Sequence, residues 1–192
     1  MSAIRVATIG AGKRVLETSL PSLDAAGEAF QLEAVYARSA RSIDAAGGPL
    51  EVRAFEELEE RGLADIDLVY VAVGKDAVPE VLARLAKLEP TGTDLLIETP
   101  VVRFRHFRHA TRTAAFRNAW VAEDCSTLPW FDTVRAAVEA GACEKPRAAW
   151  FDQSAYAYHA VATARALLGG TVRRGRRRRL AGRFALRELQ FS

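Results

Sequence analysis

The sequence predicts an α/β fold in which helices cover both faces of a doubly wound parallel sheet, with the beginning of a truncated α+β second domain after it. Two observations carry this prediction. Short apolar segments alternate five times with helical segments between residues 4 and 100, and such alternation is typical of parallel sheets. The segment 67–74 is almost continuously apolar, as expected of a strand buried on both faces.

The expected strands are apolar runs bounded by turn residues, and the expected helices carry apolar residues at helical spacing. In the first domain, 1–122, we expect strands at 4–9, 31–37, 67–74, 93–100 and 118–122, and a short edge strand at 51–54. Its helices are expected at 13–26, where Pro21 kinks or divides the helix, and at 42–47, 55–62 and 77–88. Gly62 is expected to close the helix at 55–62. In the second domain, 123–192, we expect helices at 130–140 and 155–168, a strand at 147–153 and a hairpin within 171–192.

The first strand runs into the turn Gly10-Ala11-Gly12, and a helix follows. This layout suits the pyrophosphate of a dinucleotide, because the first glycine permits a tight turn and the second lets the backbone approach the phosphates. Val15 replaces the third small residue of the pattern, which predicts looser helix packing or a displaced helix start. The alternative is a βα turn that merely requires glycine. The candidate pyrophosphate-binding residues of this Rossmann domain are Gly10, Gly12, Lys13 and Arg14.

The end of the second strand indicates which nicotinamide cofactor fits. A carboxylate there would bind the ribose hydroxyls of NAD, but the chain has Arg38-Ser39-Ala40-Arg41, and Glu33 lies inside the strand. Two guanidinium groups and a hydroxyl suit a 2′-phosphate. Arg38, Ser39 and Arg41 therefore predict NADP, with NAD less favoured; the alternative is a solvated loop of surface arginines.

Composition indicates a globular, cytoplasmic protein. The chain of 192 residues is 49% hydrophobic, contains no apolar run long enough to cross a membrane, and enters a strand directly after its N-terminus, which leaves no room for a signal peptide. Cys125 and Cys143 lie far apart, so we expect neither a metal site nor a disulfide framework. The net charge of +3 conceals a basic end: eight arginines and one glutamate lie between Thr171 and Ser192.

Several motifs together resemble the glucose-fructose oxidoreductase, inositol dehydrogenase and rhizopine-catabolism (Gfo/Idh/MocA) family, over about residues 3–170. They are the glycine turn, the strand 67–73, Glu98-Thr99-Pro100, and a helix that begins near Tyr156-Ala157-Tyr158-His159-Ala160. The resemblance implies an oxidoreductase that uses a nicotinamide cofactor and acts on a small molecule, and the arginines after the second strand favour NADP as that cofactor. It also implies that Val73, Gly74 and Lys75 lie against the nicotinamide ribose, and that Glu98 and Pro100 shape the nicotinamide pocket.

Two departures from the family bear on catalysis. Most members have lysine where this chain has Thr99, and a threonine hydroxyl is a poor general acid. Members often have aspartate four residues before the histidine, where this chain has Ala155. The remaining catalytic candidates are His159, Tyr156, Tyr158 and Thr99; alternatively, His159 only caps or packs on a helix.

The length of the chain and its basic segments leave further alternatives. Similar family members continue for well over a hundred residues through an open sheet that often forms a dimer interface, so we expect a homo-oligomer here. The arginine-rich end predicts a charged hairpin or solvated tail, with an RNA-binding or acidic-partner tail or a truncated end as alternatives. The segment Arg103–Arg112 combines arginines with aromatics; we expect a helix with Phe104, Phe107 and Thr111 facing the core, and nucleic acid as an unlikely partner.

The leading hypothesis is hydride transfer between NADP and a carbonyl, imine or hydroxyl carbon, with His159 or a neighbouring tyrosine moving the proton. The rival hypothesis is a regulatory or accessory protein that binds the nicotinamide cofactor and has lost catalysis.

Overall fold

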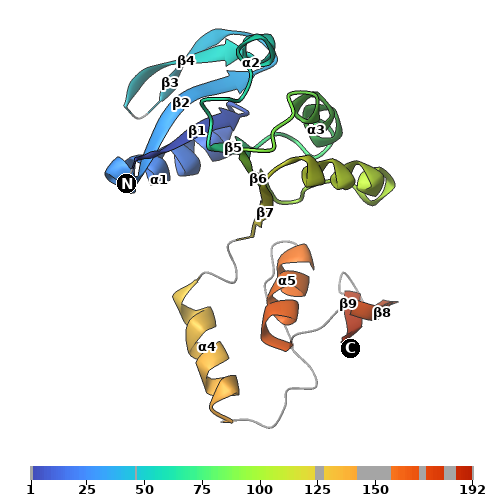
Figure 1. Cartoon of the computed structure of the whole chain (residues 1–192). Helices are drawn as coiled ribbons and strands as arrows, with labels where there is room; N and C mark the ends of the chain where they lie inside the picture. The colour runs from blue at the N-terminus through green and yellow to red at the C-terminus, as the bar shows by residue number, and fades with distance from the viewer. Residues whose placement is uncertain are drawn as a thin grey trace. The chain divides into compact units, whose positions relative to one another are not determined.

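The computed structural model describes residues 2–45, 47–123, 128–141, 157–168, 172–179 and 185–191. The chain divides into two compact units, Met1–Ala122 and Glu123–Ser192 (Figure 1).

The first unit is built on a seven-stranded sheet with the order β3-β4-β2-β1-β5-β6-β7. All neighbouring strands are parallel except β3 and β4. From β1 the chain moves outward to β2 and β4, then returns to the other side of β1 to form β5, β6 and β7, which is the predicted doubly wound topology. The strands are β1 (Ile4–Ile9), β2 (Phe30–Ala37), β3 (Arg41–Ala45), β4 (Gly48–Ala54), β5 (Leu68–Val71), β6 (Asp94–Glu98) and β7 (Asn118–Ala122).

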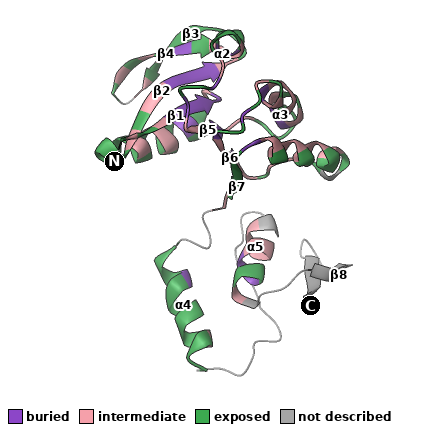
Figure 2. Ribbon diagram, viewed as in Figure 1, coloured by how far each residue is buried: buried purple, intermediate pink, exposed green. Residues whose placement is uncertain are grey.

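The helical segments of this unit are η1 (Val15–Ser19), α1 (Leu20–Ala25), η2 (Gly27–Ala29), α2 (Phe55–Arg61), α3 (Val78–Ala86) and η3 (Phe104–Ala115). They cover both faces of the sheet, as the core shows. On β5, Val69 and Val71 belong to one apolar cluster, whereas Tyr70 between them belongs to a second cluster. Because neighbouring residues of a strand point to opposite faces, both faces of β5 are covered, and the buried residues follow the central strands (Figure 2).

The helix expected at 42–47 is wrong, because residues 42–45 belong to strand β3 and Gly47 lies in a turn. β3 pairs with β4 in an antiparallel hairpin, in which Ile43 lies opposite Leu50. Gly47 and Gly48 close the hairpin, and Gly48 has φ 112°, a conformation that glycine adopts easily. The hairpin places β4 between β2 and β3, so β4 is an internal strand and the expected edge position was also wrong.

The segment after β6 is helical, but the expected inward face is wrong. Phe107 is 68% exposed and Thr111 is exposed, whereas His106, His109 and Arg112 are half-buried. The reason is that η3 is a 3-10 helix, in which residues three apart lie on one row, instead of the 3.6-residue repeat of an α-helix. The side chain of Phe104 lies outside the described residues.

The helix expected at 13–26 is present but changes character along its length. Its middle, η1, is a π-helical segment that leads directly into α1, where Pro21 lies in the first turn. Proline removes a backbone donor and crowds the preceding turn of a helix, and a wider turn before it accommodates this. Pro21 therefore follows a local widening, and the helix continues past it.

The described residues of the second unit form two helices and a hairpin. The helices are α4 (Pro129–Glu139) and α5 (Ala157–Leu168), and the strands β8 (Val172–Arg179) and β9 (Ala185–Phe191) pair antiparallel, as the expected hairpin requires. The strand expected at 147–153 lies outside the described residues. Among the residues described, no helix combines the length and apolarity needed to cross a membrane.

Candidate functional site

The predicted cofactor residues meet at one edge of the sheet. β1, β2, β5 and β6 are parallel, so their carboxyl ends share an edge, and ligands of doubly wound folds bind outside that edge where the strand order reverses. Here the reversal falls between β1 and β5. The segment 10–14 follows β1, 38–41 follows β2, 73–75 follows β5, and Glu98 and Pro100 lie at the end of β6.

Gly10 fixes the turn at the centre of this edge. Its φ is 117°, its N–H donates to the carbonyl of Tyr36 over 2.8 Å, and a Cβ at this position would lie 2.3 Å from the carbonyl oxygen of Ala72. Only glycine fits, because the backbone conformation and the space both exclude a side chain. Gly10 therefore brings the ends of β1, β2 and β5 into direct backbone contact.

Gly12 differs from Gly10 because it faces open space. A Cβ at Gly12 would meet no atom within 4 Å, and the Gly12 carbonyl accepts the first helical hydrogen bonds, from the N–H groups of Val15 and Leu16. The exposed residues Lys13 and Arg14 begin the helix. The turn thus leaves room for an anion in front of the helix start.

Val15, the departure from the small-residue pattern, is fully buried beside Val6 and Tyr70. The helix is not loosely packed there. The π-helical segment begins at Val15 itself, so the helix widens at the point where this larger side chain packs.

A hydrogen-bond network joins Arg14 to the end of β6. The Arg14 Nε donates to Glu98 Oε1 over 2.9 Å, the Tyr70 hydroxyl donates to the same oxygen over 2.8 Å, and Ser19 Oγ donates to the Tyr70 hydroxyl over 3.0 Å. Burial, assisted by the Glu98 hydrogen bond, raises the pKa of Tyr70 to about 12, so Tyr70 is a neutral donor near neutral pH.

The sequence predicts that Arg14 lies at the pyrophosphate and Glu98 at the nicotinamide, and in the structure the two side chains form an ion pair. Tyr70 and Ser19 were not predicted from the sequence. A single tyrosine within an otherwise aliphatic strand is the signal that could have pointed to the network, because a buried tyrosine hydroxyl needs a partner.

A second ion pair lies across the ends of β5 and β6. Arg103 contacts both carboxylate oxygens of Asp76, with Nη2 at 2.6 Å from Oδ2 and Nε at 2.5 Å from Oδ1. The hydrogen bond from Arg103 lowers the pKa of Asp76, which keeps the carboxylate ionised. Lys75 beside it is exposed, and Thr99 is half-buried.

The end of β2 presents positive charge of a different kind. Arg38, Ser39 and Arg41 are all exposed, and within the part of the chain that the structure describes, no ion pair engages either arginine. Two guanidinium groups and a hydroxyl at the carboxyl edge can take an external phosphate.

The described residues of the second unit contain a histidine–carboxylate pair. His159, on α5, has its Nδ1 atom 2.7 Å from Glu123 Oε1, and the two side chains are 23% and 15% exposed. Sequence reasoning singled out His159 and missed Glu123. Tyr156 lies outside the described residues, as does the side chain of Tyr158.

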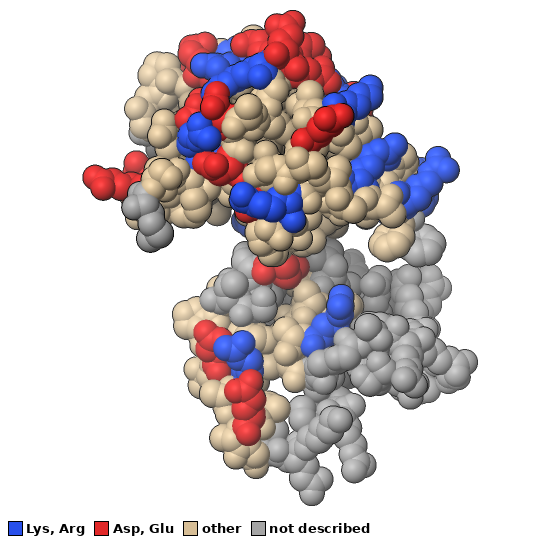
Figure 3. Space-filling view, viewed as in Figure 1, with Lys and Arg blue, Asp and Glu red and all other residues tan. Residues whose placement is uncertain are grey.

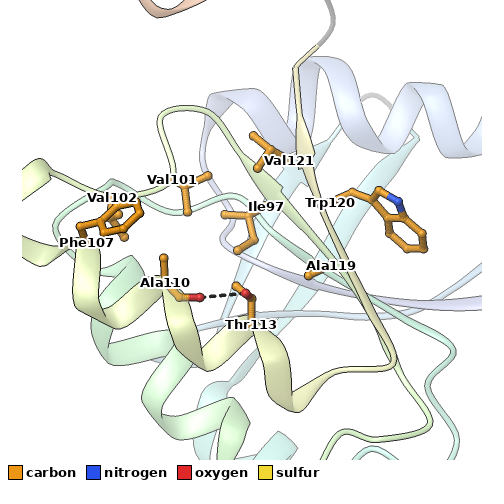
Figure 4. A pocket seen from close by; sticks show the side chains of 9 residues that line it. All are labelled: Ile97, Val101, Val102, Phe107, Ala110, Thr113, Ala119, Trp120 and Val121. Atoms are coloured by element: carbon orange, nitrogen blue, oxygen red, sulfur yellow. Dashed lines mark hydrogen bonds between the residues drawn. The ribbon is translucent and has the colours of Figure 1, made fainter. Parts of the chain in front are cut away.

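An apolar pocket of about 370 Å³ lies between η3 and the edge formed by β6 and β7 (Figure 4). It is lined by Ile97, Val101, Val102, Phe107, Ala110, Thr113, Ala119, Trp120 and Val121. None of the predicted cofactor residues lines it, and Thr113 Oγ1 already donates to the Ala110 carbonyl. The pocket therefore offers few groups for a charged ligand.

Within the described ranges, no three His, Cys, Asp or Glu residues gather in a way that could hold a metal ion. His106 and His109 have ring centroids 6.0 Å apart. Arg112 lies against His109 Nδ1, and burial, together with this neighbouring charge, lowers the pKa of His109.

Lys and Arg gather over η3, whereas Asp and Glu gather over α2 (Figure 3).

No family model matches the chain, and no curated protein matches it. Solved structures do. An oxidoreductase from Thermotoga maritima is 20% identical with a TM-score of 0.67, over 88% of this chain and 61% of that one. KijD10, a 3-ketoreductase from Actinomadura kijaniata in complex with NADP and TDP-benzene, is 23% identical with a TM-score of 0.58, over 76% of this chain and 45% of that one.

Gal80p from Saccharomyces cerevisiae, in a super-repressor mutant form, is 14% identical with a TM-score of 0.67, over 89% of this chain and 54% of that one. The chain thus spans about half the length of the solved structures it matches. At these identities the likeness establishes the fold: the first unit is a Rossmann-type α/β domain.

Proposed function

We propose that the chain is an NADP-dependent oxidoreductase-like protein whose first unit binds NADP at the carboxyl edge of its sheet. One observation carries the proposal: the tight Gly10 turn, the open space in front of Gly12 and the exposed cations after β2 share the carboxyl edge of a sheet whose strand order reverses beside β1. KijD10, which shares the fold, is in complex with NADP.

The residues present fit the cofactor. The backbone of Gly12 and Lys13 would approach the pyrophosphate, where the N–H groups of a helix start favour an anion. Arg14 would lie beside it while Glu98 orients its guanidinium. Arg38, Ser39 and Arg41 would hold the 2′-phosphate, and Val73, Gly74, Lys75 and Pro100 would line the nicotinamide half.

A bound NADPH supplies a hydride for a carbonyl or imine carbon of a small molecule, and NADP accepts one from a hydroxyl carbon. The chain's own residues must then bind the substrate and move one proton. His159, Tyr156 and Tyr158 are the proposed proton carriers. The Thr99 hydroxyl does not titrate near neutral pH, so it is not proposed to carry the proton. Its role would be to donate a hydrogen bond to the reacting oxygen.

A fluorescence titration tests the proposal. Dialysed full-length protein added to NADPH should enhance or blue-shift the nicotinamide emission in a saturable way, and NADP⁺ should reverse the change. Lys87→Ala, which removes one cation at the C-cap of α3, serves as the charge control and should bind like the parent. A flat response at high micromolar protein would refute cofactor binding.

The second candidate function is a regulatory or accessory protein that binds NADP without turnover. Thr99 in place of lysine and Ala155 in place of aspartate favour it, and the super-repressor form of Gal80p shares the fold. A broad panel of carbonyls and imines separates the two functions. NADPH that binds but is never consumed would support the regulatory role.

Self-association belongs to the same proposal, because in the family that the sequence resembles an open sheet often forms the dimer interface. We expect a dimer, and a strictly monomeric mass at tens of micromolar would contradict it. Nucleic-acid binding through the arginine-rich end would show as affinity that falls steeply with salt and disappears when residues 171–192 are deleted.

A further inference from the structure

We propose that Glu123 is the positioning residue of His159: its carboxylate holds the neutral imidazole in the Nδ1–H tautomer, so that Nε2 is the nitrogen that accepts a proton. The value of this tautomer for proton transfer rests on the proposed function. The tautomer itself does not, since it follows from the contact between two side chains of the second unit.

The geometry assigns the proton. His159 Nδ1 and Glu123 Oε1 are 2.7 Å apart, the length of a charge-assisted hydrogen bond. An ionised carboxylate can only accept, so Nδ1 must be the donor. A neutral imidazole carries one ring proton, and with that proton on Nδ1 the lone pair lies on Nε2.

The surroundings keep the contact in place. The Glu123 and His159 side chains are 15% and 23% exposed, so water competes weakly for the hydrogen bond. Thr163, one turn further along α5, is 3% exposed and donates its Oγ1 to the His159 carbonyl over 2.8 Å. Glu123 directly follows the last strand of the first unit, so its backbone enters the second unit from an extended segment.

Glu123 provides His159 with a carboxylate, which Ala155 cannot provide. In the family that the sequence resembles, an aspartate often lies one helical turn before the histidine, and this chain has alanine there. Glu123, 36 residues before His159, brings a carboxylate to the ring from a different segment. The loss of the helical aspartate therefore leaves His159 with an orienting acid, a role that carboxylates commonly play for functional histidines.

The test measures the tautomer directly in the full-length protein. With ¹⁵N-labelled histidine, long-range proton–nitrogen NMR correlations distinguish Nδ1–H from Nε2–H rings, and the chain has 3 histidines. His159→Asn identifies the His159 signals. In spectra recorded near pH 8.5, the parent protein should show His159 in the Nδ1–H form.

Glu123→Gln should shift His159 away from this form, because an amide N–H can donate to Nδ1 and the two tautomers then compete. Glu123→Asp should restore it in part. If the hydrogen bond had only a structural role, the glutamine side chain would keep a hydrogen bond to His159 and the tautomer of the ring would stay the same. Glu139→Gln, on the exposed face of α4, is the matched control and should leave the His159 signals unmoved.

A parent protein with His159 mainly in the Nε2–H form would overturn the proposal, and so would identical His159 tautomers in the parent and in Glu123→Gln. The parent measurement needs no variant, so it stands even if a substitution unfolds the protein. It also needs no cofactor: an Nδ1–H ring in a protein that ignores NADPH would refute the proposed function and leave the Glu123 assignment intact.

Discussion

The amino edge of the sheet and the β2 side of its carboxyl edge carry opposite kinds of charge arrangement. At the amino edge, arginines are paired across neighbouring strands: Arg5 contacts Asp67 over 3.3 Å, and Arg117 contacts both oxygens of Asp94 over 2.8 and 2.6 Å. At the carboxyl edge, Arg38 and Arg41 are exposed, and within the described ranges neither has an ion pair.

This difference separates stability from binding. Charges that already satisfy each other link strands together and have little left to offer a ligand. Exposed cations that lie close together repel one another unless a bound anion neutralises them. The carboxyl edge itself is divided, because its β6 side is tied by Arg14, Glu98 and Tyr70, whereas its β2 side is open.

The largest expected effect is at Gly10, where the carboxyl edge has a structural role. Gly10→Ala should lower the free energy of unfolding by roughly 3 kcal/mol or more, since backbone strain of about 1–3 kcal/mol adds to a collision with the Ala72 carbonyl. Urea unfolding followed by circular dichroism measures it.

Gly12→Ala is the matched substitution, because the added methyl group meets no atom. Its unfolding free energy should stay within about 1 kcal/mol of the parent, while NADPH affinity falls because the methyl group occupies the space proposed for the phosphates. Equal stability losses in the two variants would contradict this account of the turn.

The open side of the carboxyl edge should set cofactor preference. Arg38→Ala combined with Arg41→Ala should weaken NADPH binding by roughly tenfold to a hundredfold, the effect of losing charge-assisted hydrogen bonds, and should leave NADH affinity unchanged. Calorimetric titration with both cofactors measures the ratio. Parallel losses for NADPH and NADH would show that these arginines do not contact the 2′-phosphate.

On the tied side of the same edge, Tyr70→Phe should cost about 1–1.5 kcal/mol of unfolding free energy, because Glu98 loses a buried donor. Ser19→Ala, which removes a donor one step further from Glu98, should cost less. Chemical denaturation at neutral pH compares them. A Tyr70→Phe variant as stable as the parent would mean that Arg14 alone satisfies Glu98.

The smallest expected effect belongs to the amino edge and depends on pH. Hydrogen bonds from Arg117 lower the pKa of Asp94 below its ordinary value of about 3.9. The pair therefore stabilises the folded state above that value, and its contribution is lost as the pH falls through the folded pKa. Asp94→Asn should be less stable than the parent at pH 7 by up to about 1 kcal/mol, and the difference should shrink toward pH 3. A difference that grows on acidification would contradict the sign.

Local pattern was sufficient for much of the fold. The near-continuous apolar runs located the central strands, the limits of β7 agree with those expected, and Gly62, with φ 75°, ends α2 as the sequence indicated. Local pattern failed where the structure depends on the type of helix or on which strands pair. The β3–β4 hairpin depends on Ile43 meeting Leu50 across a glycine turn, and the exposed face of η3 depends on a 3-10 repeat that residue spacing does not reveal.

The candidate site divides in the same way. The glycine turn and the arginines after β2 can be read from the sequence, because each belongs to one strand end. The pairing of Tyr70 with Glu98 and that of Glu123 with His159 could not be read from the sequence, since the partners lie 28 and 36 residues apart. Such contacts follow from tertiary packing, and no single segment encodes them.

The contrast between the two edges is tested most directly by mapping backbone amide shifts on ¹⁵N-labelled protein during an NADPH titration. The account expects saturable changes in 10–14, 38–41 and 73–75 at the carboxyl edge, with Arg5, Asp94 and Arg117 at the amino edge unaffected. Changes centred on the amino edge, or none at high micromolar NADPH, would contradict it.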